Sequence, residues 1–394
     1  MSARGEGGDA SARIVLGSYL IRYPLGGMIS NVLQWLVGLQ RLGHDVYFVE
    51  KSGYPNSCYD PARDRMSDDC SYGLRVVNDL LSRFGLEDRW CYVDAGGGYH
   101  GMPRERVEGV LGTADVFVDM GTHGSWLPEA AGARVRVLVD GEPGFTQMRM
   151  ELGAGGPPSA GYDRYYTVGQ NIGGPASSAP TAGKEWRTVF HPVVPELFDL
   201  GPPPPGSAYT TVMNWQSHEP LDFEGRRYGQ KDVEFGRFFG LPELTGVPLE
   251  VAVSGKGVPL EELRRRGWRI RDGHEVTMSF DSFRDYIASS RGEFGVCKNV
   301  FVATRSGWFS DRSAAYLAAG RPVVLQDTGF GAHLPTGTGL FAVGSAEEAA
   351  AALEEIERDH DRHAKWAREI AVEHLDAGRV LPRFLEEIRG SVSG

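Results

Sequence analysis

Short apolar runs and stretches of helical spacing alternate along the first half of the chain. After the first run, apolar residues recur every three or four positions from Ile29 to Leu42, which predicts a helix that Gly43 ends. A second helix is predicted over residues 72–84. The apolar runs themselves predict strands at 13–19, 46–49, 115–118, 135–139 and 165–168. Strands that alternate with helices are typical of a parallel sheet covered by helices.

The same alternation restarts after a proline-rich segment, GPPPPG at 201–206. Four consecutive prolines form a stiff spacer, so we place a domain boundary there. Beyond it, the apolar runs predict strands at 209–213, 249–253, 268–270, 300–303 and 323–325. Helices are predicted at 231–239, 260–266, 283–289, 310–319, 346–356, 360–375 and 379–388. The pattern predicts an α/β protein of two Rossmann-like domains, residues 13–200 and 207–370, with a helical C-terminus over 371–394.

The amino-acid composition excludes some classes of binding partner. The chain has 394 residues, 41% of them hydrophobic and 24% charged, as in ordinary globular proteins. Its net charge of −11 argues against a nucleic-acid or anionic-membrane partner, because both need basic surface. There is no apolar run of about 18 residues and no signal-peptide pattern, so we expect a cytoplasmic protein without a membrane span. The four cysteines show no CxxC spacing and no histidine at zinc spacing, which predicts reduced thiols.

The most distinctive stretch is TRSGWFSDRSAAYLAAGRPVVLQDTGFG at 304–331. A turn leads into the predicted 310–319 helix, which Gly320 ends and Pro322 prevents from continuing. A helix N-terminus with free backbone N–H groups, hydroxylated side chains and nearby arginines can bind an anion. The alternative is that Ser310 or Asp311 merely caps the helix. The candidate anion-binding residues are Arg305, Ser306, Gly307, Trp308, Ser310, Asp311, Arg312 and Ser313.

A glycine loop joins the first predicted strand to the first helix. It contains Gly26 and Gly27, and the second strand ends at an acid, Glu50. These features invite a dinucleotide-binding interpretation, but the motif G-x-G-x-x-G is absent between Gly17 and Gly27. Two interpretations remain: the glycine pair lets the backbone approach a ligand, or it only shapes a turn.

Several strings carry a resemblance to a known family. They are DGEPGFTQ at 140–147, TTVMNW at 210–215, YGQKDVEF at 228–235, RSGWFSDRS at 305–313, YLAAGRPVV at 316–324 and QDTGF at 326–330. These blocks resemble GT-B glycosyltransferases, and most of all an actinobacterial and cyanobacterial glycosyltransferase-like family. The matching blocks span most of residues 13–345. The resemblance implies a GT-B fold, in which two Rossmann-like domains face each other across a cleft and the last helix crosses back to the first domain.

The resemblance also implies a donor site for a nucleotide-diphosphate sugar on the second domain. Lys231 matches the lysine that lies on the diphosphate in related retaining enzymes, and Arg305 or Arg312 would share the phosphate charge, with Lys298 as a further candidate. Asn214, in the exit loop of the 209–213 strand, joins these donor-binding candidates. In such enzymes a glycine loop after the first strand, here Gly26 and Gly27, faces the donor phosphate. We expect no cofactor and no metal, because no DxD signature is present.

One departure from the family pattern affects the stereochemistry. Related retaining enzymes carry two glutamates eight positions apart, where this chain has Gly307 and Ala315. Asp311 is the residue that could replace the sugar contact. The sequence therefore does not decide between retention and inversion of configuration.

Acidic and histidine residues follow two predicted strands of the first half. Ligands bind beyond the carboxyl ends of strands in open α/β sheets, so His123 is the candidate general base and Asp119 the carboxylate that orients it. Glu142 and Asp140 are reserve candidates for the base. The alternative is that His123 is a hydrogen-bonded structural residue.

These residues together predict a glycosyltransferase that acts on a small-molecule acceptor through an oxygen, nitrogen or sulfur nucleophile. A bacterial pathway such as antibiotic biosynthesis fits the GC-biased arginine usage. The alternatives are a sugar-nucleotide epimerase or hydrolase on the same fold, and a module that binds nucleotide sugars without turnover. Whether the chain forms a homodimer stays open, as do the donor's base and sugar and the identity of the acceptor.

Overall fold

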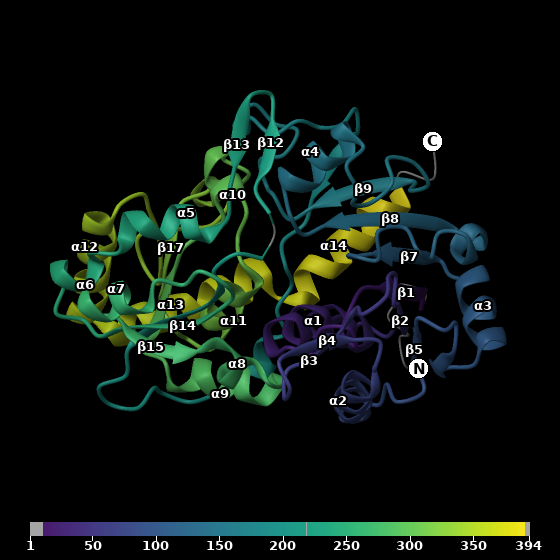
Figure 1. Ribbon diagram of the computed structural model, residues 1–394, viewed down its shortest axis with the longest axis horizontal. Coiled ribbons are helices and arrows are strands. Elements are labelled where there is room, and N and C mark those ends of the chain that lie inside the picture. The colour runs from purple at the N-terminus through teal and green to yellow at the C-terminus, as the bar shows by residue number, and fades with distance from the viewer. Residues whose placement is uncertain (1–10, 218, 391–394) are drawn as a thin grey trace, which may run out of the picture.

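The computed structural model describes residues 11–217 and 219–390, and most of its strands belong to two separate sheets (Figure 1). The first sheet has the order β10-β9-β8-β7-β1-β2-β5-β6, and all of its pairings are parallel except β5 with β6. Its strands are β1 Arg13–Gly17, β2 Asp45–Lys51, β5 Trp90–Val93, β6 Tyr99–Gly101, β7 Val116–Asp119, β8 Val135–Asp140, β9 Arg164–Thr167 and β10 Trp186–Thr188.

The second sheet is parallel throughout, with the order β15-β14-β11-β16-β17-β18. Its strands are β11 Tyr209–Asn214, β14 Leu249–Ser254, β15 Arg269–Asp272, β16 Gly292–Gly295, β17 Val323–Gln326 and β18 Leu340–Val343. The proline-rich segment 201–206 therefore joins the last strand of one sheet to the first strand of the other. The domain limits 13–200 and 207–370 stay a prediction.

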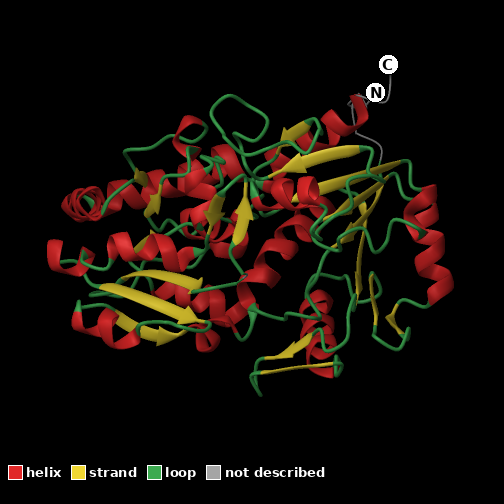
Figure 2. Ribbon diagram, turned by 45° about the horizontal axis from the view of Figure 1, so that its top comes forward, coloured by secondary structure: helices red, strands yellow, loops and turns green. Residues whose placement is uncertain are grey.

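Helices cover both faces of the sheets (Figure 2). In β1, Ile14 and Leu16 pack in one hydrophobic core while Val15 packs in another, as expected for a strand buried on both faces. The helices are α1 Gly26–Arg41, α2 Ser71–Ser82, α3 Arg104–Gly112, α4 Phe145–Leu152, α5 Lys231–Phe235, α6 Leu241–Leu244, α7 Leu260–Arg265, α8 Gly273–Thr277, α9 Phe280–Ser289, α10 Asn299–Ala303, α11 Asp311–Ala318, α12 Ala346–Arg358, α13 His360–Ile370 and α14 Ala377–Gly390. Two hairpins stand apart from the sheets, β3 Cys58–Asp60 with β4 Arg65–Ser67 and β12 Leu221–Phe223 with β13 Arg226–Tyr228.

One predicted strand is wrong. The apolar run 300–303 forms helix α10, and the strand of this β-α-β unit is β16, which pairs with β11 and β17. A short buried apolar run does not distinguish a strand from a buried helical turn. The sequence of β16, GEFG, contains two glycines and a glutamate, so it gives little strand signal.

The C-terminal helix α14 crosses to the first sheet and packs on α1 (Figure 1). The ring of Phe384 lies edge-on to Trp35 at 5.3 Å and to Tyr166 at 4.8 Å between centroids. Gly38 of α1 permits this approach, because a Cβ there would lie 2.7 Å from the side chain of Ala377. Residues 391–394 of the predicted C-terminal segment lie outside the described residues.

The acid at the end of β2 has a structural role. Both carboxylate oxygens of Glu50 accept hydrogen bonds from the backbone amides of Leu20, Ile21 and Arg22, at 2.7–3.0 Å. Glu50 thereby fixes the loop that follows β1. This structural role explains the acid at the end of β2 without a bound dinucleotide. Among the helices of the described residues, none combines the length and hydrophobicity required to cross a bilayer.

Candidate functional site

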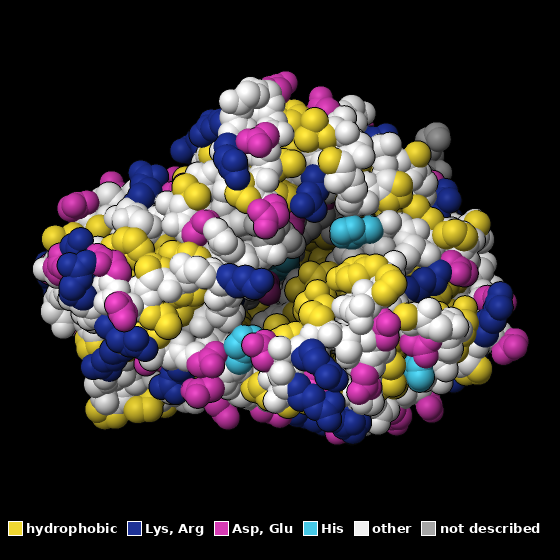
Figure 3. Space-filling model, in the orientation of Figure 1, with side chains coloured by type: hydrophobic (Ala, Val, Ile, Leu, Met, Phe, Trp, Pro, Cys, Tyr) yellow, Lys and Arg dark blue, Asp and Glu magenta, His cyan; other side chains and the backbone are white. Residues whose placement is uncertain are grey.

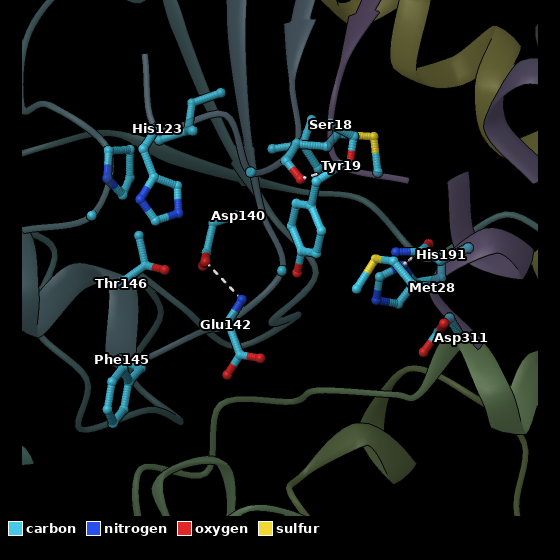
Figure 4. Close-up of a pocket in the computed structure, with 18 of the residues that line it drawn as sticks. Ser18, Tyr19, Met28, His123, Asp140, Glu142, Phe145, Thr146, His191 and Asp311 are labelled. Atoms are coloured by element: carbon cyan, nitrogen blue, oxygen red, sulfur yellow. Dashed lines mark hydrogen bonds between the residues drawn. The ribbon is translucent and has the colours of Figure 1, made fainter. Parts of the chain in front are cut away.

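The two sheets bring their topological switch points to one cleft. In the first sheet the chain leaves β1 toward β2 and returns on the other side at β7. In the second sheet β11 and β16 flank the corresponding point. A cleft of about 300 Å³ opens beyond β1, β7 and β8, and the molecule is visibly hollowed between its halves (Figure 3). Tyr19, His123, Glu142 and His191 line it from the first half, and Trp308 and Asp311 from the second (Figure 4).

His123 lies in the loop after β7, in a left-handed backbone conformation with φ of +52°. The expected hydrogen bond from its ring to the Asp119 carboxylate is not present in the described structure. The Asp119 carboxylate instead accepts the amides of Gly121, Thr122 and Gly124 and the hydroxyl of Tyr162, at 2.7–3.1 Å. Desolvation lowers the pKa of His123, and the charge of Asp119 opposes this shift. Asp119 therefore shapes the loop and does not orient the imidazole.

Asp140, which ends β8, and Glu142, which follows it, also have different roles. Asp140 is buried and accepts hydrogen bonds from Gln147, Thr167 and the amide of Glu142 at 2.8–2.9 Å. Burial raises the pKa of this carboxyl, which these donors oppose. Glu142 points into the cleft (Figure 4), and its oxygens lie 2.6 and 2.7 Å from Nζ of Lys298 in the second half. Both reserve candidates line the cleft, but Asp140 is held by these three donors, whereas Glu142 pairs with Lys298.

Lys231 begins α5 and lies buried in the second half. Its amine has no hydrogen-bond partner among residues 11–217 and 219–390. Burial lowers the pKa of the Lys231 ammonium to about 7, and the neighbouring charges of Arg312 and Lys298 add to this effect. Arg305 is not among the charges that act most strongly on Lys231. The charge of Glu293 opposes the shift. A buried lysine without a hydrogen-bonded counterion, beside an arginine and a second lysine, has the chemistry to hold an anion.

Arg312, in the first turn of α11, is held by a buried ion pair. Its Nε lies 2.5 Å from Glu293 of β16, and its Nη1 donates to the carbonyl of Val212 at 2.8 Å. Its Nη2 is buried and has no partner in the described part of the chain, as is also true of the Ser313 hydroxyl. Two nitrogens of the guanidinium are thus fixed by protein, while the third keeps an unused donor.

The turn before α11 joins the two halves of the molecule. Ser306 accepts the amide of Asn171 at 3.0 Å through its carbonyl, and its buried hydroxyl accepts the amide of Trp308. Gly307 has φ of +74°, and a Cβ there would lie 2.8 Å from the backbone nitrogen of Asn171. Ser306 and Gly307 thus have a structural role at the junction, and their contact with a phosphate stays a prediction.

Arg305 and Trp308 flank this junction. The Arg305 side chain is largely exposed and lies 4.0 Å from Asp327, while its carbonyl accepts a hydrogen bond from Asn171. Trp308 forms a β-bridge with Gly169 and lines the cleft with its ring. The two arginines therefore differ, because the Arg305 side chain faces solvent while that of Arg312 is buried.

Ser310 and Asp311 begin α11 as predicted. Ser310 is the N-cap residue, but its hydroxyl does not cap the helix, so the amides of the first turn receive no side-chain partner from it. Asp311 points into the cleft (Figure 4). Asn214 ends β11 and is exposed beside Gly255, where a Cβ would lie 2.5 Å from its Oδ1.

The two glycines at the start of α1 differ in their surroundings. A Cβ on Gly26 would lie 2.3 Å from the carbonyl of Ser279 and 2.7 Å from Phe283, so this glycine permits α1 to pack on α9. That Gly26 faces a donor phosphate stays a prediction. Gly27 lines the cleft with open space around it, which is compatible with a ligand approaching the backbone.

His191 lines the cleft but is not predicted from the sequence. This histidine follows β10, is 5% exposed and lines the cleft. Its Nδ1 lies 3.1 Å from Oδ1 of Asn31 on α1. No sequence pattern singles it out, because Asn31 and His191 are 160 positions apart and only the packing of α1 brings them together.

No protein-family model matches the sequence, and no curated protein matches it. Solved structures of glycosyltransferases, however, align with nearly the whole chain. An α-glucosyltransferase in complex with UDP and a 13-mer DNA containing a central A:G mismatch aligns with a TM-score of 0.57 and 10% identity, covering 97% of this chain and 100% of that one. AviGT4, a glycosyltransferase involved in avilamycin A biosynthesis, aligns with a TM-score of 0.53 and 15% identity, covering 97% and 98%. Anabaena Alr3699/HepE in complex with UDP and glucose aligns with a TM-score of 0.54 and 11% identity, covering 96% and 100%.

At these identities the alignments establish the fold. The chain has the mixed α/β GT-B architecture of UDP-binding glycosyltransferases, and the predicted fold class is confirmed. The resemblance of the individual motifs to one glycosyltransferase-like family is not tested by these alignments and stays a prediction.

Proposed function

We propose that the protein is a glycosyltransferase that moves a sugar from a nucleoside-diphosphate donor, with UDP as the first nucleotide to test, to a small-molecule acceptor. The observation that carries the proposal is the pair of buried cations, Lys231 and Arg312, beside β16. The Lys231 amine and Nη2 of Arg312 have no hydrogen-bond partner in the described structure. This pair lies at the carboxyl edge of the second sheet, where open α/β sheets bind ligands.

The two buried cations suit the chemistry of sugar transfer. Negative charge develops on the diphosphate as the bond to the sugar breaks, and fixed cations there stabilise the transition state. Lys231 and Arg312 supply that charge, and the start of α11 adds backbone amides and the positive end of a helix dipole. The donor sugar would then extend toward Asp311 and Trp308, which line the cleft between the halves.

The acceptor would enter from the first half, past His123 and Glu142. We favour a small molecule over DNA because the chain carries a net charge of −11, which repels a polyanion. A role in bacterial specialised metabolism is part of the proposal, and the likeness to AviGT4 supports it at the level of fold.

Product analysis separates the proposed transferase from its alternatives. The protein is incubated with UDP-glucose and other nucleotide sugars, with and without a panel of phenols, sugars and amines, and the products are identified by mass spectrometry. A transferase gives glycoside and nucleoside diphosphate only when an acceptor is present. An altered sugar nucleotide or free sugar without acceptor would show the epimerase or hydrolase, and unchanged donor would show a binding module.

Binding of UDP should weaken as the pH rises above about 7. The free amine of Lys231 loses its proton near that pH, whereas a bound diphosphate favours the ammonium, so binding at higher pH takes up a proton. Each pH unit above 7 should cost up to about tenfold in affinity until the bound amine itself titrates. Calorimetry from pH 6 to 9 measures the slope, and Lys231→Arg, which stays charged, should flatten it. An equally steep slope in that variant would assign the titration to another group.

Glu142→Gln should strengthen UDP binding by about three- to tenfold, roughly 1 kcal/mol. The Glu142 carboxylate pairs with Lys298, and the charge of Lys298 acts on Lys231. Removing the carboxylate's negative charge therefore makes the surroundings of Lys231 more positive. Glu108→Gln, which breaks the exposed pair with Arg104, is the matched control and should change nothing. Weaker binding in Glu142→Gln would mean that the Glu142–Lys298 pair holds the pocket together.

A further inference from the structure

His191 has the geometry of an oriented proton acceptor. Its Nδ1 lies 3.1 Å from the side-chain oxygen of Asn31, which can only accept, so Nδ1 carries the proton. The neutral ring then has its lone pair on Nε2. This nitrogen has no partner in the described ranges, and the little exposed surface of the residue lies in the cleft (Figure 4). The protein thus presents one basic nitrogen, in a fixed tautomer, to the cleft.

The charges around His191 suit a group that gains a proton during reaction. Burial lowers the pKa of the imidazole, which keeps it neutral and basic at rest. Asp311 from α11 and Glu142 from the loop after β8 are the charged groups that act on it, and both favour the imidazolium once it forms. Both carboxylates line the same cleft, one from each half of the molecule.

We infer that His191 Nε2 is the general base that takes the proton of an acceptor hydroxyl, with Asn31 as the positioning residue; this inference rests on the proposed glycosyltransferase function. The acceptor oxygen forms a bond to the anomeric carbon of the donor sugar. The bond from that carbon to the diphosphate breaks, and its electron pair leaves with the nucleoside diphosphate. The hydroxyl proton passes to Nε2 and from there to solvent. A neutral alcohol or phenol is thereby the acceptor class, because an ionised thiolate would need no base.

His123, the base predicted from the sequence, lacks these features. No side chain among the described residues fixes its tautomer, because Asp119 is occupied by loop amides and Tyr162. The two histidines line the same cleft, so substitution of each with glutamine compares them directly.

The test measures turnover with the hydroxyl acceptor that the wild-type protein uses best, together with UDP binding. His191→Gln should lower kcat by roughly 10²–10⁴-fold with UDP affinity unchanged. His123→Gln should lower it by less than about tenfold. His374→Gln, an exposed histidine outside the cleft, is the matched control and should keep wild-type turnover. A loss below tenfold in a folded His191→Gln that still binds UDP would overturn the inference.

The pH profile provides a second measurement that a merely structural role would not change. Turnover of the wild type should fall on the acid side as His191 becomes protonated, and His191→Gln should lack that limb. Asn31→Asp places a carboxylate against Nδ1, so it should move the limb to higher pH. An unmoved limb in Asn31→Asp would contradict the assignment. Wild-type protein that forms no glycoside would refute the proposed function and this inference together, whereas equal turnover of wild type and His191→Gln would refute only the inference.

Discussion

Replacing Lys231 with methionine should raise the melting temperature of the unliganded protein and weaken UDP binding by roughly 1–3 kcal/mol, the scale of a charge-assisted contact. The two effects have one cause. Burial without a counterion lowers the pKa of the ammonium from 10.5 to about 7, so the folded protein holds this group at a cost that only an anion relieves. Methionine has a similar shape and no charge.

The sign of the pH dependence follows from the same shift. Between about pH 7 and 10.5 the unfolded chain binds a proton on Lys231 that the folded chain does not, so this residue makes stability rise with pH. Lys231→Met should reduce that slope, and each kcal/mol gained should add about 2–4 °C in a domain of this size. Lys256→Met, at an exposed lysine, is the matched control. Differential scanning calorimetry and UDP titration measure both effects, and a destabilised variant with normal UDP affinity would exclude Lys231 from the donor site.

Arg312→Met should destabilise the protein by about 3–5 kcal/mol, the usual cost of leaving one member of a buried ion pair alone. Glu293 is fully buried on β16, and Arg312 is its only charged hydrogen-bond partner in the described structure. Its second oxygen already lacks a partner there. The variant would therefore bury an uncompensated carboxylate in the middle of the second sheet.

A double-mutant cycle tests this explanation. Glu293→Gln combined with Arg312→Met removes both charges, and its free energy of unfolding in urea should recover part of the loss. Arg83→Met is the matched control, because it breaks an exposed pair with Asp281 and should cost less than about 1 kcal/mol. Arg312→Met with a loss as small as that of Arg83→Met would show that the buried pair contributes little to stability.

Much of the fold follows from local pattern. The strands β1, β2, β7, β8, β11, β14 and β17 coincide with predicted apolar runs, because strands buried on both faces are continuously hydrophobic. The helix α11 is bounded as predicted, by Ser310 before it and Gly320 after it. Lys231 also begins a helix as expected. These features are determined by residues that are close together in the sequence, so they can be predicted from it.

The errors arise where long-range packing decides. The run 300–303 is predicted as a strand, but β16 is the strand of this unit. β16 is stabilised by its two neighbouring strands and by the Glu293–Arg312 pair, and not by its own composition. Gly307 is a candidate anion-binding residue by sequence, yet its backbone packs directly against Asn171 of the other half. His191 is a candidate because Asn31 on α1 orients its ring. No local spacing could have indicated either contact.

The structure of the complex with UDP tests the central claim most directly. The account predicts that diphosphate oxygens lie about 2.7–3.2 Å from Lys231 Nζ and from Arg312 Nη2, beside the first turn of α11. A diphosphate bound instead against the loop after β7 or the 304–308 turn, with the Lys231 amine left free, would contradict it.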